Sequence, residues 1–110
     1  MIDWLRVNTL REDVGDEDFD DVVEIFIEEV TGMVTRLRIN PQMETLGEDL
    51  HALKGSALNL GFATFSAYCQ TGESLAAHGR PAEIELGQIL SSYDESLAAF
   101  LTGLKKPPAA

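Results

Sequence analysis

The sequence has 110 residues and a formal net charge of -11 at pH 7, with 19 Asp and Glu residues against 8 Lys and Arg residues. So acidic a chain lacks the basic surface that binding to nucleic acid or to an anionic membrane requires, which excludes both classes of partner. Hydrophobic residues make up 45% and charged residues 25% of the chain, a balance typical of one globular domain.

Nothing in the sequence marks the chain for export or for a membrane. No apolar run approaches the roughly 20 residues that span a bilayer. Residues 1–6 lack the basic start and long apolar segment of a signal peptide. Cys69 is the single cysteine, so no disulfide can form within the chain. A reducing compartment is the default for such a protein, and we predict a cytoplasmic location.

Helices are predicted throughout from the spacing of apolar residues and from helix-ending residues, and no segment shows the alternation of a strand. In chain order, a short helix is predicted from the capping Asp3 to about Glu12, and a second, capped by Asp16 or Asp18, runs to the break at Asn40-Pro41. The remaining predicted ranges are a third helix from Pro41 or Gln42 to Leu60, a fourth from Ala63 to Ala77, and a fifth from Pro81 to Leu104. Residues 105–110 are predicted to be a frayed tail. Short connections between long helices favour an all-α fold. We therefore expect an antiparallel up-down four-helix bundle with a short extra N-terminal helix, forming one domain over residues 1–110.

The second predicted helix has the clearest apolar stripe and a crowded acidic start. Its inward positions are Phe19, Val22, Val23, Phe26, Val30, Met33, Val34 and Leu37. Five acidic residues between Glu17 and Glu24 stand where the helix dipole favours negative charge, so we interpret them as a solvated helix start in preference to a metal cluster. The other inward positions are Trp4, Leu5, Val7 and Leu10 in the first helix, Phe65, Tyr68, Cys69, Leu75 and Ala76 in the fourth, and Leu86, Ile89, Leu90, Tyr93, Leu97, Phe100, Leu101 and Leu104 in the fifth.

The third predicted helix places a histidine on its outer face. Its core stripe, at steps of four and three, is Leu46, Leu50, Leu53, Ala57 and Leu60. At about 100° per residue, His51 points about 140° away from that stripe and therefore toward solvent. Gly47 and Gly55 lie one turn to either side of it, although a glycine inside a helix costs about 1 kcal/mol relative to alanine. We interpret the two glycines as keeping the surface around the imidazole bare.

The residues around His51 suit phosphoryl chemistry. An exposed imidazole with a nitrogen lone pair is a good nucleophile for a phosphoryl group. Lys54 follows three residues later, so its ammonium can reach an anion carried on the ring. Leu58 lies near His51 on the same helical wheel and away from the core. It could help a partner protein dock, although single exposed leucines are common.

The stretch His51-Ala52-Leu53-Lys54-Gly55-Ser56-Ala57, followed by Leu60-Gly61, closely resembles the histidine-containing phosphotransfer (HPt) domains of two-component phosphorelays. Their motif reads His-x-Leu-Lys-Gly-Ser-small, and two residues later an aliphatic residue and a glycine follow. Every position fits. The length, the predicted helices and the acidic charge fit as well, so the resemblance covers essentially the whole chain.

The resemblance implies roles for individual residues. His51 would accept a phosphoryl group on Nε2 from a receiver-domain aspartate and pass it to another receiver aspartate. Lys54 would steady the phosphoryl oxygens, and Gly55 would keep the imidazole accessible. In the family a Gln or Glu on the following helix often holds the other imidazole nitrogen. Counting along the chain places Glu73 at that position, with an ordinary solvated helix residue as the alternative.

The resemblance also implies partners. These are response-regulator receiver domains, with the receiver of a hybrid histidine kinase as a candidate donor, and the expected docking residues are Gly47, Glu48 and Leu58. No cofactor is implied for this chain, because the Mg²⁺ needed for transfer would belong to the receiver. The sequence has no Gly-rich phosphate loop. We therefore expect a carrier without kinase or ATPase activity of its own. No second apolar stripe is obvious on the predicted helices, so we expect a monomer.

Two alternatives compete with the carrier hypothesis. Glu48-Asp49-Leu50-His51 fits once the Glu-x-x-His pattern of di-metal sites in helical bundles. The helical wheel argues against this site, because it turns both Glu48 and His51 toward solvent. The stronger alternative is a docking or inhibitory module that binds a histidine kinase or a receiver without carrying phosphate. The presence of His51 together with Lys54 and Gly55 speaks against it.

Overall fold

A computed structural model describes residues 1–105 of the chain. Its elements are the helices α1 (Trp4–Val14), α2 (Asp16–Ile39), α3 (Leu46–Asn59) and α4 (Ala63–Ala77), the 3₁₀ helix η1 (Pro81–Glu83), and the helix α5 (Leu86–Lys105). Lys105 is the last residue of α5, so the predicted frayed tail is wrong at that residue. The rest of that tail, residues 106–110, lies outside the described residues.

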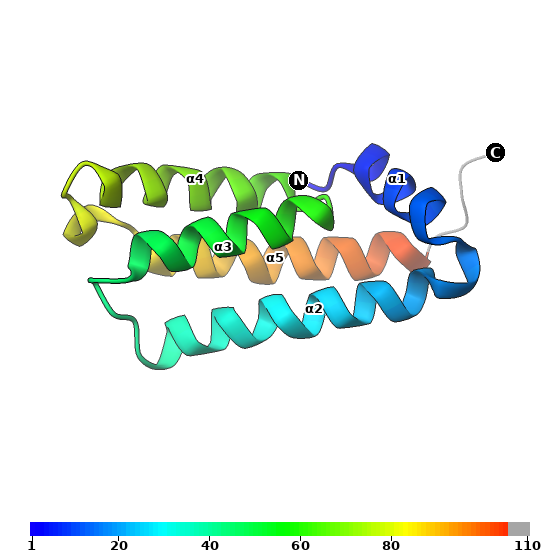
Figure 1. Ribbon diagram of the computed structural model, residues 1–110, viewed down its shortest axis with the longest axis horizontal. Coiled ribbons are helices and arrows are strands. Elements are labelled where there is room, and N and C mark those ends of the chain that lie inside the picture. Colours follow the sequence, from blue (N-terminus) through cyan, green and yellow to red (C-terminus); the bar gives the residue numbers. More distant parts are fainter. Residues whose placement is uncertain (106–110) are drawn as a thin grey trace.

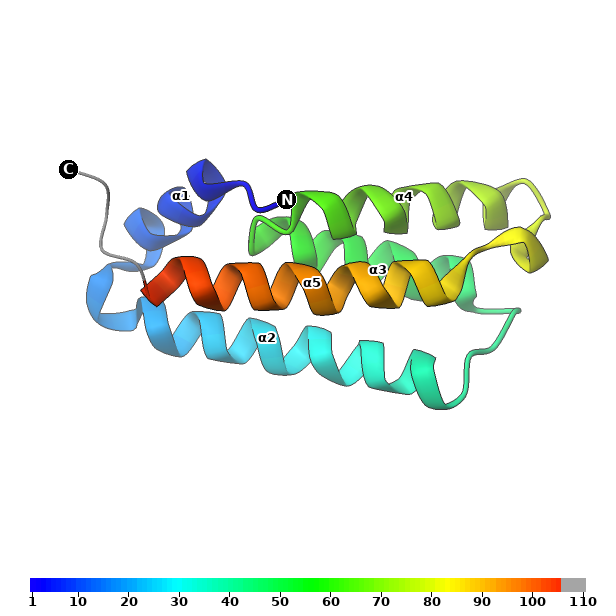
Figure 2. The same ribbon diagram turned by 180° about the vertical axis from the view of Figure 1, so that it is seen from behind.

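The four long helices α2 to α5 form the predicted bundle, and the all-α prediction is confirmed. In Figure 1, α4, α3 and α2 lie one below another with α5 behind them, and Figure 2 shows α5 in front between α4 and α2. Consecutive long helices run in opposite directions, as the short connections require. Within residues 1–105, no helix has both the length and the apolar character needed to cross a bilayer.

The short helix α1 lies across one end of the bundle (Figure 1). Asp3 caps it as predicted, because its Oδ1 accepts a hydrogen bond from the backbone N–H of Arg6 at 3.2 Å. Asp3 also donates its own N–H to the carbonyl of Gly61 at 2.7 Å. Gly61 has a φ of 75°, and a Cβ there would lie 2.6 Å from the carbonyl oxygen of Asp3, so only glycine fits this contact. The Trp4 ring stacks on Phe100 of α5, which ties α1 to the bundle at a second point.

The start of α2 corrects one prediction. The helix begins at Asp16, with Gly15 at its N-cap position and no side-chain cap. Asp16 and Asp18 therefore do not cap the helix but lie inside its first turn, where the helix dipole stabilises their negative charges. Both side chains are exposed, together with their acidic neighbours.

The third helix begins later than predicted, at Leu46 instead of Pro41 or Gln42. Met43 and Glu44 are exposed, so an extra turn before Leu46 would bury no apolar surface. The chain instead enters the helix at Thr45, whose carbonyl accepts the first helical hydrogen bond from Asp49 at 2.9 Å. The helix ends at Asn59, one residue before the predicted end.

The last helix also begins later than predicted. Pro81–Glu83 form the separate 3₁₀ helix η1, and α5 starts at Leu86. Arg80 pairs with Glu83 and closes the short turn. Ile84 is extended, with a φ of -69° and a ψ of 125°, and its half-buried side chain packs against the core. The chain therefore changes direction between Pro81 and Leu86, which a continuous helix from Pro81 could not do.

Most of the predicted core is confirmed. All five positions of the α3 stripe are at most 3% exposed. The other buried apolar residues are Val7, Leu10, Phe19, Val23, Val30, Val34, Leu37, Phe62, Phe65, Cys69, Ile89, Leu90, Tyr93 and Phe100. Leu5 and Leu101 were predicted to face inward, and both predictions are wrong, because these side chains are 79% and 42% exposed. Trp4 is partly exposed and packs through one ring face.

Helices α3 and α4 approach each other closely, because small residues line their contact. A Cβ at Gly47 would lie 2.8 Å from Cβ of Ala76, and a Cβ at Gly72 would lie 2.6 Å from Cδ1 of Leu50. Real Cβ atoms do not come that close to other carbons. Cβ of Ala76 is fixed to its own backbone, so packing requires a glycine at position 47, whereas a Cβ at position 72 would displace the buried side chain of Leu50. Both glycines therefore allow α3 and α4 to lie close together.

Candidate functional site

His51 lies on the outer face of α3, and its side chain is 68% exposed. Its neighbours Leu50 and Leu53 are fully buried. Because the backbone around His51 is anchored by these leucines, the imidazole projects from a rigid helix instead of a loop. This placement agrees with the outward direction predicted from the helical wheel.

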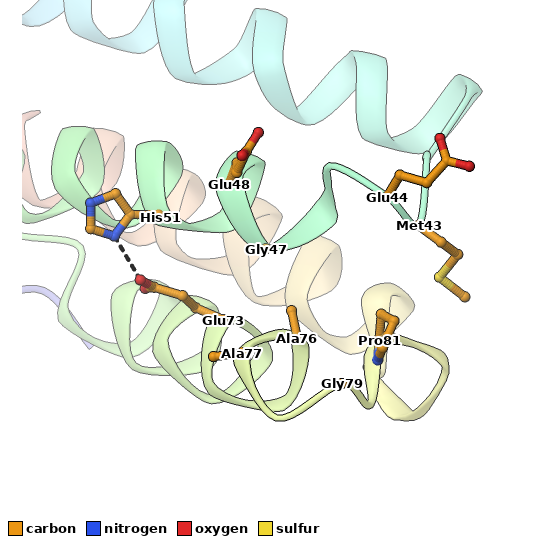
Figure 3. A pocket seen from close by; sticks show the side chains of 10 residues that line it. All are labelled: Met43, Glu44, Gly47, Glu48, His51, Glu73, Ala76, Ala77, Gly79 and Pro81. Carbon is orange, nitrogen blue, oxygen red and sulfur yellow. Dashed lines mark hydrogen bonds and ion pairs between the residues drawn. The ribbon is translucent and has the colours of Figure 1, made fainter.

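Glu73 of α4 reaches across to the imidazole of His51. Its Oε1 atom lies 2.6 Å from Nδ1 of His51, the hydrogen bond drawn in Figure 3. An ionised carboxylate only accepts hydrogen bonds, so Nδ1 carries the proton and donates the hydrogen bond to Glu73. The other ring nitrogen, Nε2, is therefore the one with a lone pair, and it points away from Glu73.

Lys54 completes the contact between α3 and α4. Its Nζ atom lies 2.8 Å from Oε2 of Glu73 and donates a hydrogen bond to Oε1 of Gln70 at 2.7 Å. The Glu73 carboxylate thus joins His51 through one oxygen and Lys54 through the other. The hydrogen bond from Lys54 lowers the pKa of Glu73, and His51 adds to this effect against the opposing influence of burial. Glu73 is therefore held in its ionised form.

The surface next to His51 is open on the side of Gly55. A Cβ at Gly55 would meet nothing within 4 Å, so packing does not require a glycine at this position. Leu58, one turn further along α3, is 49% exposed. The open surface at Gly55 and the apolar surface at Leu58 lie along α3 beyond His51.

Gly47 differs from Gly55. Its interpretation as a residue that only clears the surface is wrong, because the close contact with Ala76 gives it a packing role between α3 and α4. Its lack of a side chain nevertheless contributes to the open groove described next. The two glycines flanking His51 therefore differ in role, because Gly47 is needed for helix packing and Gly55 is not.

A groove of about 730 Å³ lies beside His51, between the start of α3 and the end of α4 (Figure 3). It is lined by Met43, Glu44, Gly47, Glu48, His51, Glu73, Ala76, Ala77, Gly79 and Pro81. Its charged lining residues are acidic, and the remainder of the lining, apart from His51, is apolar or glycine. Glu48 is exposed at its edge. The groove can therefore take an apolar group flanked by positive charge.

The structure gives no support to a metal site at Glu48 and His51. In residues 1–105, no three His, Cys, Asp or Glu side chains gather in a way that could hold a metal ion. Cys69 lies beneath the site in the core, and its burial, followed by the nearby charge of Glu73, raises the pKa of its thiol to about 12. A thiol of this kind is protonated and unreactive.

The sequence predicted His51, Lys54, Gly55 and Glu73 as site residues, and the structure brings their side chains or surfaces together on one face of α3 and α4. Gln70 was missed. The available signal was its position three residues before Glu73, which puts both side chains on the same face of a helix.

A family model for the Hpt domain matches residues 21–104. The match covers most of α2 and all of α3 and α4, and with them every residue of the site, whereas α1 lies outside it. A comparison with curated proteins gave no match, and a comparison with solved structures gave none either.

Proposed function

This chain belongs to the Hpt domain family, and we propose that it is a phosphorelay intermediate that takes a phosphoryl group from one receiver domain and gives it to another. Members of the family act in histidine phosphotransfer of two-component signalling and interact with receiver domains. The observation that carries the proposal is the contact between Glu73 and Nδ1 of His51 at 2.6 Å. It favours the tautomer in which the exposed Nε2 is the nucleophile.

The proposed reaction transfers a phosphoryl group directly from the aspartate oxygen of a receiver to Nε2 of His51. The Nε2 lone pair attacks the phosphorus of a receiver's aspartyl phosphate. The bond from phosphorus to the aspartate oxygen breaks, and the carboxylate leaves with that electron pair. The new bond joins phosphorus to Nε2, and the ring becomes a cation because the Nδ1 proton stays in place. Transfer to the second receiver is the same step reversed on another aspartate.

Two charged residues of the site fit these changes. The Glu73 carboxylate accepts the Nδ1–H bond, so it would stabilise the positive charge that develops on the ring. The Lys54 ammonium pairs with the same carboxylate and would offset the negative charge on the phosphoryl oxygens. Both groups are already placed before the reaction, which lowers the reorganisation it requires.

We further propose that the receiver docks across His51, with Gly55 giving its active site access and Leu58 in apolar contact. On the other side it would cover the groove that includes Gly47 and Glu48. This placement is supported by the open surface at Gly55, the exposed Leu58 and the apolar groove with its acidic lining.

Hpt domains are carriers and not kinases, so the receiver would supply the Mg²⁺ that phosphoryl transfer needs. A phosphorylated donor receiver, such as that of a hybrid histidine kinase, would start the relay. The single cysteine fits a reducing cytoplasm. We propose that the chain works there as a monomer.

Incubation with a radiolabelled, phosphorylated receiver domain tests the proposal. The chain should acquire an acid-labile, base-stable label, and His51→Gln should abolish it without changing the helical circular dichroism. His78→Gln is the matched control, since His78 is the other histidine of the chain and its Nδ1 lies 2.7 Å from the Ser74 carbonyl in the same helix. Label that survives His51→Gln would rule out the proposal. Tight receiver binding without label on the unaltered chain would instead favour the docking or inhibitory module.

A further inference from the structure

Gln70 on α4 holds the side chain of Lys54. Its Oε1 atom accepts a hydrogen bond from Lys54 Nζ at 2.7 Å. Because an ammonium group only donates, the amide oxygen and not the amide nitrogen faces it. Gln70 and Glu73 are three residues apart on α4, so Lys54 is held by two acceptors on one helix face.

Two anchors matter because a lysine side chain is flexible. Four rotatable carbons carry the ammonium, and fixing them costs conformational entropy. With Glu73 as the sole partner, the ammonium could swing around one carboxylate oxygen. The second acceptor at Gln70 defines its position. An ammonium has three N–H donors. The hydrogen bond to Gln70 uses one of them, so the ammonium keeps donor capacity for a phosphoryl oxygen beside its ion pair with Glu73.

The chemical type of the second anchor is also informative. Glu73 already places one negative charge at the site, and its lowered pKa keeps that charge in place. A carboxylate at position 70 would hold Lys54 equally well, but it would add a second negative charge beside an anionic phosphoryl group. An amide oxygen anchors the ammonium without that charge.

We propose that Gln70 is a positioning residue, which fixes the Lys54 ammonium for the phosphoryl group arriving at His51 and leaves its positive charge available. The proposal rests on the proposed function, since it assigns Gln70 a part in phosphorylation of the same histidine. Gln70 acts through Lys54, and its effect should disappear when Lys54 is absent.

A double-mutant cycle tests this dependence. The variants are Gln70→Leu, Lys54→Ala and the pair together, and the phosphoryl donors are phosphoramidate and a phosphorylated receiver. We expect Gln70→Leu to slow labelling by about fivefold with either donor, the scale of one hydrogen bond to a charged group that is partly exposed. The receiver KM should stay unchanged. In the Lys54→Ala background, Gln70→Leu should have no further effect. An unchanged rate for Gln70→Leu, or an equal loss in both backgrounds, would overturn the proposal.

Gln70→Glu tests the need for a neutral anchor. This variant retains an acceptor for Lys54, so its labelling rate relative to the unaltered chain should be low at low salt and recover as salt screens the added charge. A defect that is absent at low salt would show that neutrality is unimportant. The defect of Gln70→Leu should not depend on salt. Gln88→Leu, an exposed glutamine on α5, is the matched control and should behave like the unaltered chain.

Two measurements separate failure of this proposal from failure of the proposed function. His51→Gln is assayed beside the Gln70 variants. If it is still labelled, the proposed function fails. If it is not labelled and Gln70→Leu reacts at the full rate, only the role of Gln70 fails. Nuclear magnetic resonance of the Lys54 ammonium tests the anchor without phosphorylation, since its ordered signal should be lost in Gln70→Leu and kept in Gln88→Leu.

Discussion

Nδ1 of His51 and Oε1 of Glu73 lie 2.6 Å apart, although the two residues belong to different helices and are separated by 22 positions in the sequence. The contact depends on how closely α3 and α4 pack, which Gly47 and Gly72 allow. The tautomer of the exposed imidazole is therefore determined by helix packing as well as by the neighbours of His51 on its own helix.

Glu73→Gln should alter the pH dependence of stability. The pKa of Glu73 is lowered from its ordinary value of 4.5, mainly by the hydrogen bond from Lys54. The ionised carboxylate therefore stabilises the fold above that value, and this contribution is lost as the pH falls through the lower folded pKa. Urea unfolding from about pH 6 to about pH 3 measures it. The free-energy difference between the unaltered chain and Glu73→Gln should shrink toward low pH. The exposed Glu28→Gln on α2 is the control, and a difference independent of pH would contradict the prediction.

Gly55→Leu should separate stability from phosphotransfer. The added side chain enters open space and replaces a poor helix former, so the free energy of unfolding should rise by up to about 1 kcal/mol. Transfer from a receiver should nevertheless slow, because the new side chain stands beside His51. Labelling by phosphoramidate, a small donor, should change much less. Gly32→Leu is the control, since Gly32 also has open space around it but lies on α2. Normal transfer from the receiver in Gly55→Leu would refute the access role.

Gly47→Ala should destabilise the protein despite its better helix propensity. The new Cβ would lie 2.8 Å from Cβ of Ala76, so α3 and α4 must separate. Overpacking of this kind costs about 1–3 kcal/mol, measurable by urea unfolding. Adding Ala76→Gly should recover much of the loss by restoring the space. Gly32→Ala, which meets no neighbour, should not destabilise. Equal stabilities for Gly47→Ala and Gly32→Ala would show that the helix contact is looser than described.

Leu58→Arg should weaken docking of a receiver without changing the chemistry at His51. Leu58 is 49% exposed, so the fold should tolerate the change. Removing its apolar contact from an interface should lower kcat/KM for receiver-dependent transfer by about tenfold, which corresponds to about 1.4 kcal/mol. Phosphoramidate labelling should stay the same. Leu101→Arg on α5 changes a similarly exposed leucine away from His51 and serves as the control. Equal kcat/KM values for the two variants would remove Leu58 from the docking surface.

The sequence was most informative where apolar residues recur with helical spacing. The stripe from Leu46 to Leu60 gave both the core of α3 and the outward direction of His51, because 3.6 residues per turn relate these positions directly. Helix starts were predicted less well. The starts at Leu46 and Leu86 depend on where tertiary packing begins to bury side chains, and Pro41 and Pro81 permit a helix start without requiring one.

The grouping of side chains around His51 was predicted in part. Local spacing on one helix placed Lys54 and Gly55 beside His51. The position of Glu73 was predicted only through the resemblance, because its partner lies on another helix. Gln70 and the packing role of Gly47 were missed, since both depend on which residues of α4 face α3. That pairing is a property of two helices together, and the pattern of either helix alone does not contain it.

The hydrogen bond from Nδ1 leaves His51 with one nitrogen facing solvent. If this histidine carries phosphate, the donor and the acceptor must approach the same atom from the same side, so each excludes the other. The exchange would then follow double-displacement kinetics, in which the first receiver departs before the second arrives. An excess of dephosphorylated donor would compete with the acceptor for the carrier. The relative amounts of the two receivers, and not only their affinities, would thus govern which way phosphate moves.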